Sequence, residues 1–122
     1  NTPIGVLLMD QSVIAGIGNI FRAELLYRAA INPFRAGKEV GRASLKGIWN
    51  DARKLMRTAM EDRRIVTTRV KARPHRRGRA QDTEVHYVYR RGGKLCYVCG
   101  ATIEKADMGG RTVYWCPVCQ KV

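Results

Sequence analysis

The sequence predicts a mainly α-helical protein that ends in a small β-hairpin module. Three observations lead to this fold class. Apolar residues recur at helical spacing through the first 60 residues, all four cysteines lie in the last 27, and a long basic segment joins the two parts. At 122 residues, the chain can form one compact domain or a small domain with an added module.

The first helix is expected to begin at Thr2 and Pro3, with threonine as N-cap and proline at the first helical position. The apolar residues that follow can enter a core. Gly16 and Gly18 then interrupt the pattern and predict tight turns between two helices.

A second helix is predicted from Gly18 or Asn19 to about Ala30, and Asn32 before Pro33 is expected to stop it. Its buried side is predicted to carry three apolar residues, Phe21, Leu25 and Leu26. Arg22 and Arg28 of this helix are expected to project outward. Glu24 lies near both arginines and is expected to form an ordinary surface ion pair.

A third helix is predicted with Ser44 as its N-cap, although Gly47 leaves the starting residue open. Its apolar residues step by three and four and form one stripe, which comprises Leu45, Ile48, Ala52, Leu55 and Ala59. Basic residues lie off this stripe. The pattern is typical of a core helix with a solvated basic face.

Residues 63–79 contain eight basic residues and no acidic one, and Pro74 and Gly78 break any periodicity. They predict a flexible basic loop, which either contacts phosphates or is a solubilising surface segment. Because like charges repel one another, the phosphate contact is favoured. Residues 85–89 alternate like a strand. His75 and His86 are expected to be surface or packing residues.

The cysteines form two matched pairs, Cys96 with Cys99 and Cys116 with Cys119, sixteen residues apart. This spacing predicts a closed four-sulfur site for one structural Zn²⁺ ion, in a small β zinc ribbon. Gly100 suits the turn after the first pair. Residues 102–104 and 111–115 are the expected strands, with residues 107–110 as their turn. Disulfides and a thioredoxin-like redox pair are weaker alternatives.

The formal charge of +13 and the isoelectric point of about 10.3 predict an anionic partner, with nucleic acid ahead of an anionic membrane surface. No apolar run reaches the roughly 18 residues of a membrane span. The start at Asn1 lacks the basic residues of a signal peptide, so a cytoplasmic, nucleoid-associated protein is expected. Recognisable catalytic triads, phosphate loops and paired carboxylates are missing from the sequence, whereas slim residues at 16–19 suit phosphate binding at a helix N-terminus.

Two motifs together resemble a known family. Residues 7–11 and 14–21 resemble the helix-two-turns-helix element of formamidopyrimidine-DNA glycosylases and endonuclease VIII, and residues 96–120 resemble their zinc finger. Arg22, the pair Glu104-Lys105 and Trp115 look more like the endonuclease VIII branch. The resemblance implies a helix-two-turns-helix DNA-binding domain over residues 1–90 and a zinc-finger β-hairpin over residues 91–122.

The family's enzymes excise oxidised bases and cleave the abasic strand, with an N-terminal proline and glutamate on a β-sandwich domain. This chain starts differently, and the nitrogen of Pro3 is held in an amide bond. The resemblance therefore implies a monomeric C-terminal half that binds damaged or abasic double-stranded DNA, works with a separate N-terminal catalytic domain and is inactive alone. A non-enzymatic zinc-ribbon module that binds RNA or transcription machinery is the alternative.

The resemblance also implies roles for individual residues. Asn19, with Gly18 beside it, matches the asparagine that binds phosphate next to the lesion. Arg111 matches the hairpin arginine that grips the phosphates flanking the flipped nucleotide and is associated with δ-elimination. Glu24 matches an acid near the site. Lesion preference is expected to reside outside this sequence.

Overall fold

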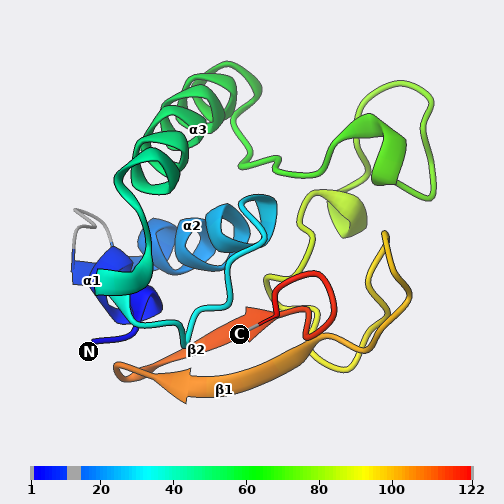
Figure 1. The fold of residues 1–122 in the computed structure, drawn as a ribbon. Helices are drawn as coiled ribbons and strands as arrows, with labels where there is room; N and C mark the ends of the chain where they lie inside the picture. Colours follow the sequence, from blue (N-terminus) through cyan, green and yellow to red (C-terminus); the bar gives the residue numbers. More distant parts are fainter. Residues whose placement is uncertain (1, 11–14, 122) are drawn as a thin grey trace.

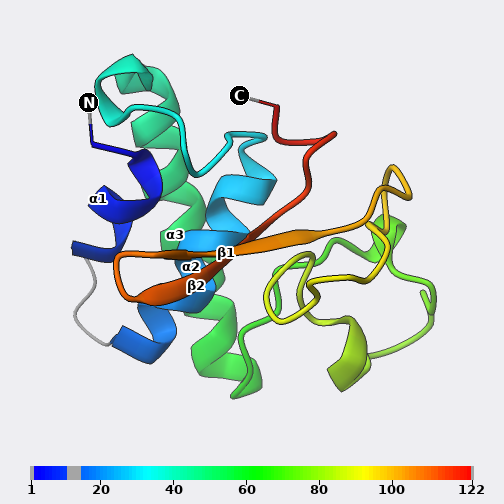
Figure 2. The ribbon, with the colours of Figure 1, turned by 90° about the horizontal axis from the view of Figure 1, so that it is seen from below.

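The computed structural model describes residues 2–10 and 15–121. Its helices are α1 (Ile4–Asp10), α2 (Ala15–Arg28) and α3 (Arg42–Asp62), and its strands are β1 (Glu104–Met108) and β2 (Arg111–Trp115). Helix α2 lies between α3 on one side and the β-hairpin on the other, with α1 beside it (Figures 1 and 2). The mainly α fold with a C-terminal hairpin is therefore confirmed, and α2 is the element that joins its parts.

The starts of the first two helices differ from the prediction. Pro3 lies just before α1. Its carbonyl accepts hydrogen bonds from the N–H groups of Val6 and Leu7, and its backbone forms an isolated antiparallel β-bridge with Ala36. Helix α2 already begins at Ala15, so Gly16 and Gly18 lie in its first turn and do not form a turn before it. Packing of α2 against the other elements outweighs the roughly 1 kcal/mol that each helical glycine costs. Residues 11–14, where the predicted inter-helix segment continues, lie outside the described residues.

Helix α2 ends before the predicted stop at Pro33. Ala30 adopts a left-handed conformation with φ of 59°, and the N–H of Ile31 donates to the carbonyl of Leu26. The N–H of Ala30 donates to Tyr27, which completes a Schellman motif. This cap turns the chain toward α3.

Helix α3 begins at Arg42 after Gly41, so Ser44 lies inside its first turn and is not its N-cap. The predicted apolar stripe is confirmed, because Ile48 and Leu55 are buried and Leu45 packs against the same core. This core combines residues of α1, α2 and α3 with two residues between α2 and α3, and comprises Ile4, Leu25, Leu26, Ile31, Val40, Ile48 and Leu55.

The basic segment over residues 63–79 contains a single helical turn, Val70–Ala72. Some of its arginines are bound to acids of the chain itself: Arg64 pairs with Asp62 and Asp82, and Arg79 pairs with Asp62. The unbroken positive run in the sequence is thus partly neutralised by residues at either end of the segment. The strand predicted over residues 85–89 is wrong, since the strands of the described residues all lie in the C-terminal hairpin.

The hairpin pairs Glu104 with Trp115 and Met108 with Arg111 in antiparallel register. Its turn is only two residues long, Gly109 and Gly110, with φ of +63° and +80°. Left-handed conformations at both positions match the type I′ turn, which suits the twist of a hairpin and favours glycine. The first strand therefore lies further along the chain than the predicted residues 102–104.

A second core surrounds the cysteines and includes two residues of α2, Ala23 and Tyr27, which pack with Tyr87, Val88 and Ile103. The helical part and the hairpin module thus share buried side chains, and the boundary after residue 90 stays a prediction. Among the described residues, no helix is both long and apolar enough to cross a membrane.

Candidate functional site

The four cysteines converge on one point. All four sulfur atoms lie within 4.8 Å of one another, with 3.9 Å between the Sγ atoms of Cys96 and Cys119 and 3.4 Å between those of Cys99 and Cys116. A tetrahedral zinc ion with Zn–S bonds of about 2.3 Å requires sulfurs about 3.8 Å apart. The sulfur positions therefore fit one structural Zn²⁺ ion, and four thiolate ligands close its coordination shell.

Backbone N–H groups point at these sulfurs. Val98 donates to Cys96, Ala101 to Cys99, and Cys119 to Cys116, at N–S distances of 3.4 to 3.5 Å. Gly100, with φ of 77°, provides the predicted left-handed turn after the first pair. N–H donors stabilise negative charge on sulfur, so the backbone favours the thiolate form that zinc requires.

Gln120 anchors the second pair of cysteines to the helical part. Its side chain is fully buried, accepts a hydrogen bond from the N–H of Cys116 at 2.8 Å, and donates to the carbonyl of Ile31 at 2.9 Å. Asn32 donates in turn to the carbonyl of Gln120 at 2.9 Å. No local sequence pattern indicates this contact, apart from the position of Gln120 directly after the last cysteine.

The tip of the hairpin is held by two side chains of α2, Asn19 and Arg22. Asn19 Nδ2 donates to the carbonyl of Thr112 at 3.2 Å. Arg22 donates to the carbonyl of Met108 at 3.0 Å, to that of Arg111 at 3.4 Å, and to Asn19 Oδ1 at 2.8 Å. Arg22 is 1% exposed, so the expectation that it projects outward is wrong. Its guanidinium instead satisfies backbone carbonyls on either side of the two-glycine turn.

The buried charge of Arg22 has no carboxylate within ion-pair distance among the described residues, and its Nε has no hydrogen-bond partner there. Burial lowers the pKa of Arg22, and the nearby charge of Arg111 lowers it further, while Asp107 partly offsets the effect. Two guanidinium groups thus lie at one end of the hairpin with little compensating negative charge. An anion at this position would relieve their repulsion.

The predicted site residues Asn19 and Arg111 are brought to the same place by these contacts. Arg111 opens β2 directly after the glycine turn and is exposed, whereas Asn19 is 8% exposed and lies one turn into α2. Gly18 is buried in the first turn of α2. The N-terminal end of α2 and the tip of the hairpin therefore lie side by side.

Glu24 is fully buried, and its predicted surface ion pair is wrong. One carboxylate oxygen accepts the N–H of Tyr87 at 2.6 Å and the hydroxyl of Thr67, and the other accepts the N–H groups of Val88 and Tyr89 at 2.8 Å each. These bonds explain why residues 85–89 do not form a strand. The amides of residues 87–89 donate to a carboxylate of α2 and not to a neighbouring strand.

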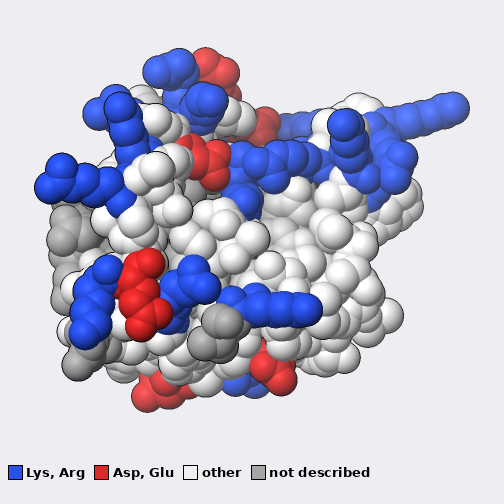
Figure 3. All heavy atoms as spheres, in the orientation of Figure 1, with Lys and Arg blue, Asp and Glu red and all other residues white. Residues whose placement is uncertain are grey.

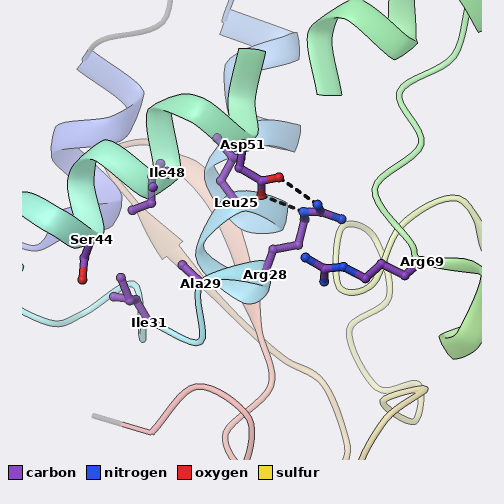
Figure 4. A pocket seen from close by; sticks show the side chains of 9 residues that line it. Leu25, Arg28, Ala29, Ile31, Ser44, Ile48, Asp51 and Arg69 are labelled. Atoms are coloured by element: carbon purple, nitrogen blue, oxygen red, sulfur yellow. Dashed lines mark hydrogen bonds and ion pairs between the residues drawn. The ribbon is translucent and has the colours of Figure 1, made fainter. Parts of the chain in front are cut away.

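Arg28 also differs from its predicted outward position. It donates two hydrogen bonds of 2.7 Å to Asp51 of α3 and one of 2.6 Å to the carbonyl of Thr67, and the bonds to Asp51 raise its pKa. The pair borders a pocket of about 310 Å³ between α2 and α3, and Arg69 extends from the other side (Figure 4). Because Arg28 lies on α2 and Asp51 on α3, their ion pair links the two helices.

Positive charge gathers over α3 and the segment 63–79, which form the upper part of the molecule in Figure 3. Exposed basic residues there include Arg53, Lys54, Arg57, Arg63, Arg69, Lys71, Arg76 and Arg77. Such a concentration of exposed positive charge on one part of the surface suits a polyanionic partner.

Comparison with known proteins identifies both parts of the chain. Residues 1–70 match the family described as "Formamidopyrimidine-DNA glycosylase H2TH domain", and residues 93–122 match "Zinc finger found in FPG and IleRS". The zinc-finger match and the sulfur geometry together identify the four cysteines as a site for one Zn²⁺ ion.

Relatives match almost the whole chain. Endonuclease 8 1 of Mycobacterium tuberculosis is 45% identical over 97% of this chain and 44% of its own length. Formamidopyrimidine-DNA glycosylase of Pelotomaculum thermopropionicum is 40% identical over 95% of this chain and 41% of its own length. The higher identity to the endonuclease 8 protein agrees with the predicted branch. The chain spans less than half the length of either relative.

Solved structures of this family also have a fold similar to that of this chain. The Lactococcus lactis Fpg in complex with abasic-site DNA superposes with a TM-score of 0.73 at 26% identity, covering 99% of this chain and 43% of that one. MutM in complex with DNA containing carbocyclic 8-oxo-G superposes with a TM-score of 0.74 at 27% identity, with the same coverage. The sequence matches, the helical arrangement and the four-cysteine hairpin agree with one another, and this chain belongs to the formamidopyrimidine-DNA glycosylase family.

Proposed function

We propose that this chain is the DNA-binding C-terminal half of a bifunctional DNA glycosylase/AP lyase that excises oxidised bases in base excision repair. The observation that carries the proposal is the hairpin tip, where the buried Arg22 and the exposed Arg111 lie close together and α2 holds the surrounding backbone. Such a rigid positive tip suits a phosphate of a DNA backbone.

The relatives support this proposal. The matched proteins are named as DNA glycosylases and an endonuclease 8, and the matched structures are complexes with abasic-site or modified DNA. A zinc-ribbon module of RNA or transcription machinery is not favoured, because the match over residues 1–70 lies outside the zinc ribbon. We therefore expect double-stranded DNA with a damaged or abasic site as the partner, bound by a monomer associated with the nucleoid.

Each predicted site residue receives a role in this proposal. Arg111 donates to phosphates that flank the extruded nucleotide. Asn19 Nδ2 carries two hydrogens, of which the bond to Thr112 uses one, and the other donates to a phosphate beside the lesion. The free amides at the start of α2 add to the same contact, and Gly18, which has no side chain, leaves room for the phosphate to approach. Glu24 acts indirectly, since its oxygens hold the backbone of residues 87–89.

Base excision itself is proposed to require a nucleophile that this chain does not supply. The nitrogen of Pro3 belongs to a peptide bond, and its residue bridges Ala36, so it cannot form a Schiff base with the sugar. Incubation of the chain with abasic DNA and borohydride should therefore trap no covalent adduct. A trapped adduct would refute this part of the proposal.

The DNA contact is tested by measuring duplex binding with fluorescence anisotropy over a series of salt concentrations. Arg111→Ala should weaken binding to an abasic-site duplex about tenfold, the loss expected for a charge-assisted hydrogen bond. It should also reduce the log–log salt slope by about one. Arg111→Lys should keep the slope but not the full affinity, because lysine lacks the planar fork. Lys94→Ala, which removes an exposed charge elsewhere in the zinc module, is the control. Equal losses for Arg111→Ala and Lys94→Ala would contradict a specific clamp.

A further inference from the structure

Tyr27 lies on α2 and reaches the zinc site from the helical side. Its side chain is 7% exposed, and its ring stacks on that of Tyr87 with the centroids 4.4 Å apart. Its hydroxyl oxygen lies 3.2 Å from Cys96 Sγ and 3.7 Å from Cys119 Sγ. One hydroxyl group thus contacts one cysteine of each pair.

We propose that Tyr27 is a positioning residue of the zinc site, whose hydroxyl donates a hydrogen bond shared by the thiolates of Cys96 and Cys119. Zinc binds cysteine as thiolate, which can only accept, so the hydroxyl must be the donor when the metal is bound. Among the described residues, the other hydrogen-bond donors to a cysteine sulfur, apart from the sulfurs themselves, are backbone N–H groups of the zinc module. Tyr27 is the side chain that links the metal site to α2.

The hydrogen bond has an electrostatic reason. Four thiolates and one Zn²⁺ ion carry a formal charge of −2, and half of the ligand set is buried. A hydroxyl donor withdraws electron density from the sulfurs and lowers the cost of keeping this charge away from water. Without the donor, the negative charge on two of the sulfurs is less well stabilised, so the site loses its zinc to a chelator more readily.

The contact also has a mechanical consequence. Asn19 and Tyr27 lie on the same helix, eight residues apart, and each binds a different end of the hairpin module. Asn19 holds the strand near the tip, and Tyr27 holds the cysteines at the base. Helix α2 thus fixes the module at two points, which restrains rotation of the hairpin against the helix.

The test uses the whole 122-residue chain with Tyr27→Phe, which keeps the ring and its stacking on Tyr87. Zinc release to excess chelator should be about tenfold faster than in the unaltered chain, the lower end of the range for loss of an outer-shell partner. In the cobalt-substituted protein, the sulfur-to-metal charge-transfer bands should move to lower energy, because the sulfur electrons are no longer stabilised by the hydroxyl. This proposal depends on the zinc site and not on DNA binding.

Tyr97→Phe is the matched control. Tyr97 follows Cys96 directly, but its hydroxyl donates to the carbonyl of Thr83 at 3.2 Å and contacts no sulfur. This variant should leave both the release rate and the charge-transfer bands unchanged. Faster release from Tyr27→Phe with unchanged bands would show that the hydroxyl affects the stability of the fold and not the electrons of the sulfurs. That result, or release within twofold of the unaltered chain, would overturn the proposal.

Discussion

Removal of the Glu24 carboxylate should destabilise the fold more than any other single change to a charged residue of α2. The carboxylate is the common acceptor for three consecutive backbone amides, at Tyr87, Val88 and Tyr89, and for the hydroxyl of Thr67. Glu24→Ala leaves these three amides without their acceptor. Val88 is completely buried, Tyr87 is 3% exposed, and water reaches only the third amide, at the half-buried Tyr89.

The magnitude follows from the number of orphaned donors. Each buried N–H that loses its acceptor costs about 1–3 kcal/mol, so Glu24→Ala should cost about 4 kcal/mol or more, which is large for a single substitution. Glu24→Gln should cost about 2 kcal/mol. Its amide nitrogen fits best where it faces Tyr87, since the Thr67 hydroxyl can then donate to the carbonyl of Val85 at 3.1 Å. Only one amide is orphaned in that arrangement.

Urea denaturation of the zinc-bound chain, followed by far-UV circular dichroism, measures these differences in the free energy of unfolding. Glu61→Ala is the control, because Glu61 is an exposed acid near the end of α3. Amide hydrogen exchange should also accelerate at residues 87–89 in both Glu24 variants. A Glu24→Ala chain within 1 kcal/mol of the Glu61→Ala control would refute the assignment of Glu24 as the anchor of this segment.

Two further predictions concern pH and metal. Burial lowers the pKa of His86 below its ordinary value of about 6.5, so the neutral ring is favoured in the folded state. The stability that the neutral ring contributes is present above about pH 6.5 and is lost as the pH falls. His86→Gln should therefore reduce the difference between the urea midpoints measured at pH 7.5 and at pH 6. An unchanged difference would contradict this role of His86. Removal of zinc by a chelator should abolish tight duplex binding, because the buried Cys96 and Cys116 are then no longer joined and the hairpin tip is no longer fixed. Fluorescence anisotropy measures the duplex affinity. Full affinity without zinc would show that the metal is not needed.

The features that sequence reasoning identified are those encoded by local spacing. The cysteine pairs converge as predicted, because two short steps and a hairpin leave few other arrangements. The stripe of α3 is buried as predicted, because its period matches the helix. The two adjacent glycines at the hairpin turn were also a local signal, although the strand before them was placed too early.

The features that sequence reasoning missed depend on partners far away in the chain. Arg22 and Glu24 are both charged and lie two residues apart on one helix, and charged side chains are normally exposed to solvent. Each is buried because it bonds to backbone groups between 63 and 89 residues away, with Arg22 donating to two carbonyls and Glu24 accepting from three N–H groups. The alternation of residues 85–89 imitated a strand for the same reason, since nothing local reveals that a carboxylate takes their amides.

The central claim is that the zinc-held hairpin and the start of α2 together recognise a distorted DNA backbone and do not merely supply positive charge. The most direct measurement is the ratio of dissociation constants for an intact duplex and for the same duplex with one abasic site, in matched salt. Extrusion of a nucleotide costs a few kcal/mol and least where the base is damaged or missing, so the abasic duplex should bind at least about tenfold more tightly. Equal affinity for the two duplexes would contradict the account.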